Sequence, residues 1–386
     1  ENNPMKSSNI PKFIDFNKPF IAKKQLTYIQ DAVQSGHISG DGSYTKKCHS
    51  WLENTLEVKK ALLTTNCTHA LEMSALLLDF KPGDEVISPS FTFVSTVNAF
   101  IQRGAKTVFV DVRTDTLNID ERHIEEKITE KTRAIYVVHY AGVGCEMDKI
   151  MQIALKNNLS VVEDNAHGLF GKYKGKQLGT FGEMACQSFH ETKNISSGEG
   201  GALLINRDDL IERAEIIREK GTDRSKFFRG QVDKYSWVDV GSSYLPSEII
   251  AAVLYSQLEE ADLIQQKRKA IWDHYAQSLK AWAHENGIIL PTIPGYCDQS
   301  FHMFYLLLPS LVERQRFIQY LREKNIYSVF HYVPLHTSSM GRRYGYRDGS
   351  LPVTEEMSDR LVRLPFYYDL TESDQDYVIS VILKFH

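Results

Sequence analysis

The sequence predicts an α/β fold with a large domain, built on a mainly parallel sheet, and a smaller α+β domain towards the C-terminus. Short apolar strands alternate with helical patterns through the first two thirds of the chain, as in sheets covered by helices on both faces. After Gly241 a long helical pattern replaces this alternation. A chain of 386 residues also exceeds the size at which one core keeps growing. We therefore place the large domain at residues 1–250, and a linking helix with the small domain at residues 251–386.

The individual elements follow from local patterns of apolar residues. In the first part we expect strands at 85–88, 107–110, 134–138, 160–163 and 202–205, and helices at 70–78, 93–102 and 147–157. In the second part we expect one helix over 247–285, strands at 301–308 and 326–330, and helices at 311–324, 354–362 and 372–384. Asp111, His139 and Asp164 end strands, so they lie at the carboxyl edge of the sheet, where open α/β sheets bind ligands.

The composition disfavours several classes of function. A net charge of −4 and a pI near 6.4 argue against nucleic-acid binding. The five cysteines lack CxxC spacing, which is typical of a reducing compartment without disulfides or a zinc site. No stretch approaches the roughly 18 apolar residues of a membrane span, and the N-terminal segment has no apolar signal-peptide core. We expect a cytoplasmic protein that binds neither membrane nor metal.

Lys193 and Asp164 suggest a cofactor. Lys193 lies in the run Ser188–Asn194, 29 positions (193 − 164) after Asp164, which ends an apolar strand. An aldehyde cofactor such as pyridoxal 5'-phosphate (PLP) needs one lysine for a covalent link and one carboxylate to keep its pyridine nitrogen protonated. In isolation each residue also has a simpler interpretation, because most lysines are surface charges and Asp164 could cap a helix or form a structural salt bridge.

Three further segments carry candidate residues with alternatives. The turn that contains Cys67 and Thr68 runs into a helix, where it could bind a phosphate or simply cap the helix through Asn66 or Thr68. An aromatic residue of the run 91–93 could stack on a flat cofactor or belong to the core. The Gly-rich run 198–201 leads into a strand, so it is a turn and no dinucleotide loop.

Two groups of cationic or ionisable residues are candidates for substrate contacts. Arg224, Lys226 and Arg229 are either surface charges exposed to solvent or part of a loop that binds an anionic substrate. His331 and His336 lack further ligands at metal spacing, so a substrate contact or a structural role is favoured.

Taken together, these motifs resemble the DegT/StrS-type nucleotide-sugar aminotransferases of PLP fold type I, over essentially the whole chain. The resemblance rests on residues 188–194, which a Gly-Gly turn and a strand follow, and on the runs 89–96 and 333–336. It implies a seven-stranded-type sheet and an obligate homodimer with shared active sites. Dehydratases of the family carry His where this chain has Lys193, so lysine favours transamination.

The resemblance also implies individual roles. Lys193 holds PLP covalently, Asp164 pairs with the pyridine nitrogen, and Phe93 stacks on the ring. The phosphate is bound by Cys67, Thr68 and Ser188, and His167 lies beside the phenolic oxygen. Ser243 lies in a run, Gly241–Leu245, that helps to complete the partner subunit's phosphate site; here Ser243 and Leu245 depart from the family's Asn and Arg.

The implied reaction moves an amino group from L-glutamate to C4 of a nucleotide-linked keto-sugar, dTDP-4-keto-6-deoxyglucose. The products are dTDP-4-amino-4,6-dideoxygalactose and 2-oxoglutarate. Two alternatives stay open: an aminotransferase that acts at C3 or on a UDP- or GDP-linked sugar, and a PLP-binding regulatory or structural protein without turnover. The basic loop 220–234 is the candidate for gripping the nucleotide diphosphate.

Overall fold

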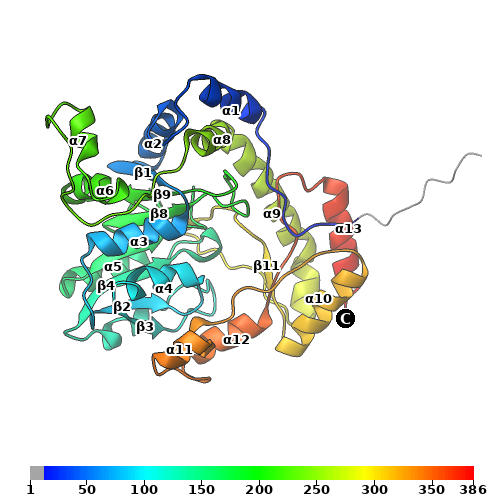
Figure 1. The fold of residues 1–386 in the computed structure, drawn as a ribbon. Helices are drawn as coiled ribbons and strands as arrows, with labels where there is room; N and C mark the ends of the chain where they lie inside the picture. The colour runs from blue at the N-terminus through cyan, green and yellow to red at the C-terminus, as the bar shows by residue number, and fades with distance from the viewer. Residues whose placement is uncertain (1–12) are drawn as a thin grey trace, which may run out of the picture.

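The computed structural model describes residues 13–386 and has a large sheet-based part next to a smaller, mainly helical part (Figure 1). The first twelve residues of the predicted large domain lie outside the described residues. Helix α13 (Glu372–Ile382) near the C-terminus packs in the smaller part, beside α9 (Ala261–Glu285). The domain boundary at residues 250/251 stays a prediction.

The large part is built on a seven-stranded sheet. In spatial order its strands are β1 (Lys60–Thr64), β9 (Gly201–Ile205), β8 (Met184–Ser188), β5 (Ser160–Asp164), β4 (Thr132–Val138), β2 (Glu85–Pro89) and β3 (Lys106–Val110). Strand β9 is antiparallel to both of its neighbours, and the other pairs are parallel. The predicted α/β fold with a mainly parallel sheet is therefore confirmed.

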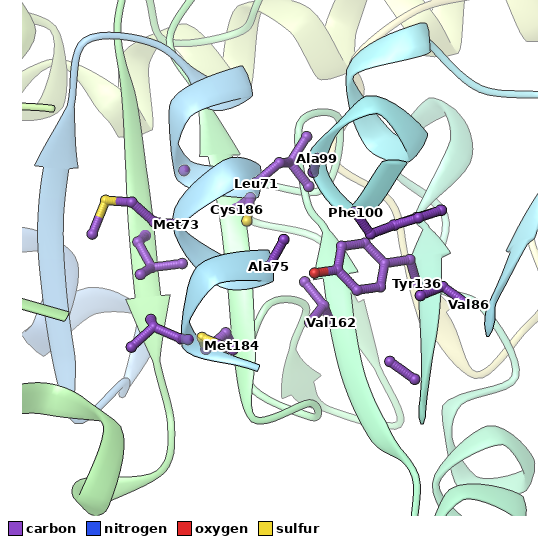
Figure 2. Packing of buried hydrophobic residues seen from close by; sticks show 14 of the residues in the cluster. Leu71, Met73, Ala75, Val86, Ala99, Phe100, Tyr136, Val162, Met184 and Cys186 are labelled. Atoms are coloured by element: carbon purple, nitrogen blue, oxygen red, sulfur yellow. The ribbon is translucent and has the colours of Figure 1, made fainter. Parts of the chain in front are cut away.

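Helices cover both faces of this sheet, because successive side chains along each strand point to opposite faces. On β1, Leu62 packs in one core cluster and Leu63 in another. The helices on the Leu62 face are α3 (Cys67–Leu77), α4 (Val94–Ile101) and α6 (Ile211–Arg218); those on the opposite face are α2 (Ser43–Leu56), α5 (Met147–Lys156) and α8 (Glu248–Glu259). Figure 2 shows Leu71 and Ala75 of α3 packed near Cys186 and Val162 of the sheet. Burial on both faces explains why the strands read as continuous apolar runs.

The remaining elements connect and complete the two parts. In the large part these are α1 (Gln25–Gln34), β6 (Lys172–Tyr173), β7 (Lys176–Gln177) and α7 (Arg224–Phe228). After α9 follow β10 (Cys297–Asp298), β11 (Tyr305–Leu307), α10 (Leu311–Glu323), α11 (Ser339–Arg343), α12 (Pro352–Arg360) and β12 (Leu361–Arg363). Strands β11 and β12 pair antiparallel, and β10 joins β6 and β7 in a three-stranded sheet.

Three expected elements of the second part differ in the structure. The expected helix over 247–285 is two helices that meet at Glu260, because α8 packs with α2 in one core cluster while the later turns of α9 pack in another. The expected strand over 301–308 begins only at Tyr305, since Phe301 has a left-handed backbone with φ 52°. The expected strand over 326–330 makes only isolated bridges, to Ile14 and Arg363.

Among the described residues, no helix combines the length and apolarity that a membrane span requires.

Candidate active site

A cavity of about 790 Å³ opens at the carboxyl edge of the parallel strands, between the two parts of the molecule. Eight of the residues singled out from the sequence line it: Cys67, Thr68, Phe93, Asp164, His167, Ser188, Lys193 and His331. The wall on the side of the smaller part includes His302 and Arg363. Residues from distant parts of the chain therefore meet in one place.

Asp164 ends β5 and presents a buried carboxylate to this cavity. One carboxylate oxygen accepts a hydrogen bond from the Thr96 hydroxyl at 2.7 Å, and the other accepts one from the Ala166 N–H at 3.2 Å. Burial raises the pKa of Asp164, and these two hydrogen bonds oppose that rise. Within residues 13–386 Asp164 forms no ion pair, which argues against the structural salt bridge and leaves the carboxylate available for a cationic ligand atom.

Lys193 follows β8 in a turn closed by its own N–H, which donates to the His190 carbonyl at 2.9 Å. Burial lowers the pKa of Lys193 to about 8, although Cys67 and Asp164 act in the opposite direction. About a tenth of such amines are neutral at pH 7, far more than for an ordinary lysine. Lys193 therefore has the character of a nucleophile and a proton acceptor.

The start of α3 provides an anion site. Asn66 caps the helix, because its side chain accepts a hydrogen bond from the His69 N–H at 2.8 Å. The capping alternative therefore holds for Asn66, whereas the Thr68 hydroxyl bonds to the Ser95 hydroxyl at 2.7 Å. The first-turn N–H groups of Cys67 and Thr68 have no acceptor within a helix and lie at its positive dipole end. Such a helix start suits a phosphate.

Gly201, at the start of β9, allows this turn to sit against the sheet. A Cβ atom at Gly201 would lie 2.3 Å from the Asn66 carbonyl carbon and 2.5 Å from the Cys67 nitrogen. Real Cβ atoms do not approach backbone atoms so closely, so only glycine fits at this position.

Phe93 and His167 flank the same space. Phe93 is 57% exposed, whereas Phe91 is 1% exposed, so the core alternative fits Phe91 and leaves Phe93 free to stack on a ligand. The His167 Nδ1 accepts a hydrogen bond from the Ala141 N–H at 3.3 Å, and burial lowers the pKa of His167. A neutral ring whose Nδ1 accepts carries its proton on Nε2, which makes His167 a hydrogen-bond donor at that atom.

Five other candidates do not line the cavity of this chain. Three of them are the basic residues of the loop 220–234, which pair with acidic neighbours: Arg224 with Glu219 at 3.1 Å, Lys226 with Glu212 at 2.7 Å and Arg229 with Glu215 at 2.9 Å. Ser243 forms an isolated bridge with Glu219. The ring of His336 bonds to Ser90 at 2.7 Å and to Glu355 at 2.8 Å. Their roles in substrate or partner-site binding stay predictions.

The structure adds site residues that the sequence reasoning missed. Thr96 lies within the run 89–96, but Thr92, to which its hydroxyl bonds, precedes α4, so no helical periodicity signals the pair. For Gly201 the sequence indicates only a turn. His302 and Arg363 carry no local signal, because they reach the cavity from the C-terminal part of the chain.

The assembled residues fit PLP. One cavity holds a partly buried lysine of lowered pKa, a buried carboxylate without an ion pair, an exposed aromatic ring and a helix start for a phosphate. This is the set of groups that such a cofactor requires. Within the described residues, no three His, Cys, Asp or Glu side chains gather as a metal-binding group.

Comparisons with known proteins identify the family. The model of the DegT/DnrJ/EryC1/StrS aminotransferase family matches residues 19–383. The chain is 34% identical to the uncharacterized protein MJ1066 of Methanocaldococcus jannaschii, with 98% of each chain covered. It is 32% identical to GDP-perosamine synthase of Escherichia coli O157:H7, with 97% of this chain and 99% of the relative covered.

Solved structures show the same fold and cofactor. Spr1654 of Streptococcus pneumoniae, in its PLP-form, superimposes with a TM-score of 0.89 at 26% identity, and the match covers 97% of this chain and 98% of that one. The same protein is also known in a PMP-form, with pyridoxamine phosphate, the aminated cofactor. The chain described here thus belongs to the DegT/DnrJ/EryC1/StrS aminotransferase family and is a PLP-dependent sugar aminotransferase.

Proposed function

We propose that this enzyme transfers the amino group of L-glutamate to C4 of dTDP-4-keto-6-deoxyglucose, giving dTDP-4-amino-4,6-dideoxygalactose and 2-oxoglutarate. The single observation that carries amino transfer is the pair of Lys193 and Asp164 in one cavity. The sugar rests on the resemblance of three runs, 40–42, 219–222 and 227–235, to dTDP-4-amino-4,6-dideoxygalactose transaminase.

Each residue has a defined task in this proposal. When bound, PLP supplies an electron sink for the charge left after removal of a proton from carbon. The carboxylate of Asp164 would keep the pyridine nitrogen of the cofactor protonated. The incoming amino acid would release Lys193 from its covalent link to the cofactor. The Nζ atom of Lys193 would then take the proton from the α-carbon of the amino acid and deliver it to C4′ of the cofactor.

A GDP-linked keto-sugar is the second candidate for the acceptor. It is favoured by the 32% identity to GDP-perosamine synthase across nearly the whole chain. The residues that would hold PLP do not distinguish the two acceptors, so the choice depends on contacts to the nucleotide and the sugar.

We also propose a homodimer in which the loop 220–234 reaches the partner's cavity. Large apolar side chains in this loop and just after it are exposed to solvent. Phe228 lies within the loop and is 70% exposed, and Trp237 follows the loop and is 80% exposed. Exposed apolar surface rimmed by charge is typical of an interaction site. Sedimentation velocity would reveal the assembly, and a monomer at micromolar concentration would contradict it. The expected cytoplasmic location stays a prediction.

The acceptor can be tested in a half-reaction. Enzyme loaded with pyridoxamine phosphate would be mixed separately with dTDP-4-keto-6-deoxyglucose, its 3-keto isomer and a GDP-linked 4-keto-6-deoxy sugar. Return of the PLP absorbance with the first sugar alone supports the proposal, and NMR of the product identifies the configuration of the amine. Return only with the GDP-linked sugar supports the second candidate, and return only with the 3-keto isomer moves the reaction to C3.

A further inference from the structure

Arg363 is a cationic residue of the cavity wall to which the proposed mechanism has given no task. It ends β12 and lines the cavity that contains Lys193. Its backbone is held by two hydrogen bonds to Val329: the Arg363 N–H donates at 2.7 Å and the Val329 N–H donates back at 3.2 Å. The base of the side chain is therefore fixed relative to the cavity.

The guanidinium of Arg363 lacks a counter-charge. Its only hydrogen bond within residues 13–386 runs from Nη2 to the Phe330 carbonyl at 3.3 Å, and its buried Nε atom has no partner. No carboxylate of the described chain lies within ion-pair distance. Its flat face lies over the Phe16 ring, 4.7 Å from the centroid. Arginine carries five N–H donors, so most of its donor capacity is unused.

Two buried arginines, Arg218 and Arg268, make shorter hydrogen bonds to the protein than Arg363 does, although the Nη2 atom of Arg218 also has no partner. Arg218 donates to the Leu63 carbonyl at 2.6 Å and pairs with Asp41 at 2.7 Å. Arg268 has no carboxylate partner, but it donates to the carbonyls of Phe301 and His302. Neither of these two lines the cavity. Since a desolvated charge without partners is costly, the open donors of Arg363 indicate an anion that binds there.

We propose that Arg363 binds the α-carboxylate of the amino-acid donor. A planar guanidinium and a carboxylate match through two parallel hydrogen bonds. The α-carboxylate is bonded to the carbon whose proton Lys193 removes, so a cation in the same cavity as Lys193 suits it. In a nucleotide sugar, by contrast, the sugar ring separates the diphosphate from C4. This assignment rests on the proposed amino-transfer function and adds the donor side of the site.

The electrostatics agree with this placement. The charge of Arg363 helps to lower the pKa of Lys193, and also those of His167 and His331, after the larger effect of burial. The guanidinium therefore acts at short range on the groups that surround the reacting atoms. A bound carboxylate would neutralise this charge at the moment the donor enters.

The test measures binding in the absence of any acceptor sugar. Calorimetry would compare 2-oxoglutarate with 4-oxobutanoate, which lacks only the α-carboxylate, on the PLP-loaded enzyme. In the unaltered enzyme we expect 2-oxoglutarate to bind roughly tenfold or more tightly than 4-oxobutanoate. Arg363→Met should abolish this difference, and Arg363→Lys should retain part of it, because it keeps the charge without the planar fork.

Arg314→Met is the matched control. Arg314 also has an unpartnered buried Nε and lies over the Phe330 ring, 5.8 Å from the centroid, but it does not line the cavity. The variant should bind both ligands as the unaltered enzyme does. Circular dichroism and the absorbance of bound PLP would verify that each variant folds and holds the cofactor. If Arg363→Met fails to fold, Arg363→Lys carries the test.

Two results would overturn the proposal. An unchanged difference between the two ligands in both Arg363 variants would show that the guanidinium does not contact the α-carboxylate. If the Arg363 variants bind dTDP more weakly but bind 2-oxoglutarate as the unaltered enzyme does, the guanidinium contacts the nucleotide diphosphate instead. Because no acceptor sugar enters the experiment, a wrong acceptor assignment would leave this result unaffected, and the half-reaction panel separates the two failures.

Discussion

The Thr96 hydroxyl donates a 2.7 Å hydrogen bond to the carboxylate of Asp164, and both side chains are buried. Thr96 lies on α4 and Asp164 at the end of β5, 68 positions apart. The Thr92 hydroxyl bonds to that of Thr96 at 2.8 Å and extends the chain of hydrogen bonds. A buried carboxylate held in this way stays ionised more readily than burial alone would allow.

Thr96→Val should weaken the function of Asp164 without removing the carboxylate. Loss of a hydrogen bond to a charged group costs about 1.5–3 kcal/mol, so the pKa of Asp164 should rise further. We expect the glutamate half-reaction to slow by roughly tenfold or more, measured by stopped-flow absorbance. Thr107→Val is the control, since its buried hydroxyl faces Ser88 at 3.3 Å, away from the cavity. Equal rates in both variants would contradict the role of Thr96.

Covalent attachment of PLP to the cofactor-free protein should depend on pH through Lys193. The neutral amine is the nucleophile, and burial lowers its pKa to about 8. The rate of attachment should therefore rise as pH increases through about 8 and level off above it. Rapid mixing with PLP between about pH 6 and 10 would measure this profile. A midpoint near the ordinary lysine value of 10.5 would contradict the lowered pKa.

Lys193→Met should stabilise the cofactor-free protein at neutral pH. A lysine whose pKa falls from 10.5 to about 8 on folding opposes folding while it is charged, by at most about 3 kcal/mol. The variant removes this cost, so its free energy of unfolding at pH 7 should be higher. The gain should shrink as pH rises from about 8 to 10.5, because the unfolded lysine then loses its proton too. Urea unfolding at several pH values would test both statements, and a pH-independent difference would contradict them.

Gly201→Ala should damage the phosphate site through the backbone. The added Cβ would overlap the carbonyl carbon of Asn66, so the turn before α3 must shift. We expect a loss of about 1–3 kcal/mol in stability and weaker PLP binding, measured by titration of the cofactor-free protein. Gly295→Ala is the control, because nothing lies within 4 Å of the added atom there. Equal PLP affinity in the two variants would contradict the role of Gly201.

Local pattern was sufficient for most of the large part. The strands ending at Val110, Val138 and Asp164 begin or end within two residues of the expected positions, because continuous apolar runs between polar turns are typical of strands buried on both faces. Specific motifs around Lys193 and Phe93 were sufficient for the family. The second part was harder to predict, since the break at Glu260 depends on which core each helix packs against.

The sequence by itself determined the fold class, the cofactor and the residue types that PLP requires. Only the tertiary structure decided which side chains meet. Three relationships are long-range, and no local pattern encodes them. The Thr96 hydroxyl bonds to Asp164, Gly201 packs closely against Asn66, and Arg363 lines the same cavity as Lys193. The tertiary structure also decided the electrostatics of the site, because burial lowers the pKa of Lys193 and the guanidinium of Arg363 has no carboxylate partner within residues 13–386. The desolvation of a charged side chain depends on the residues packed around it, and those residues come together only when the chain folds.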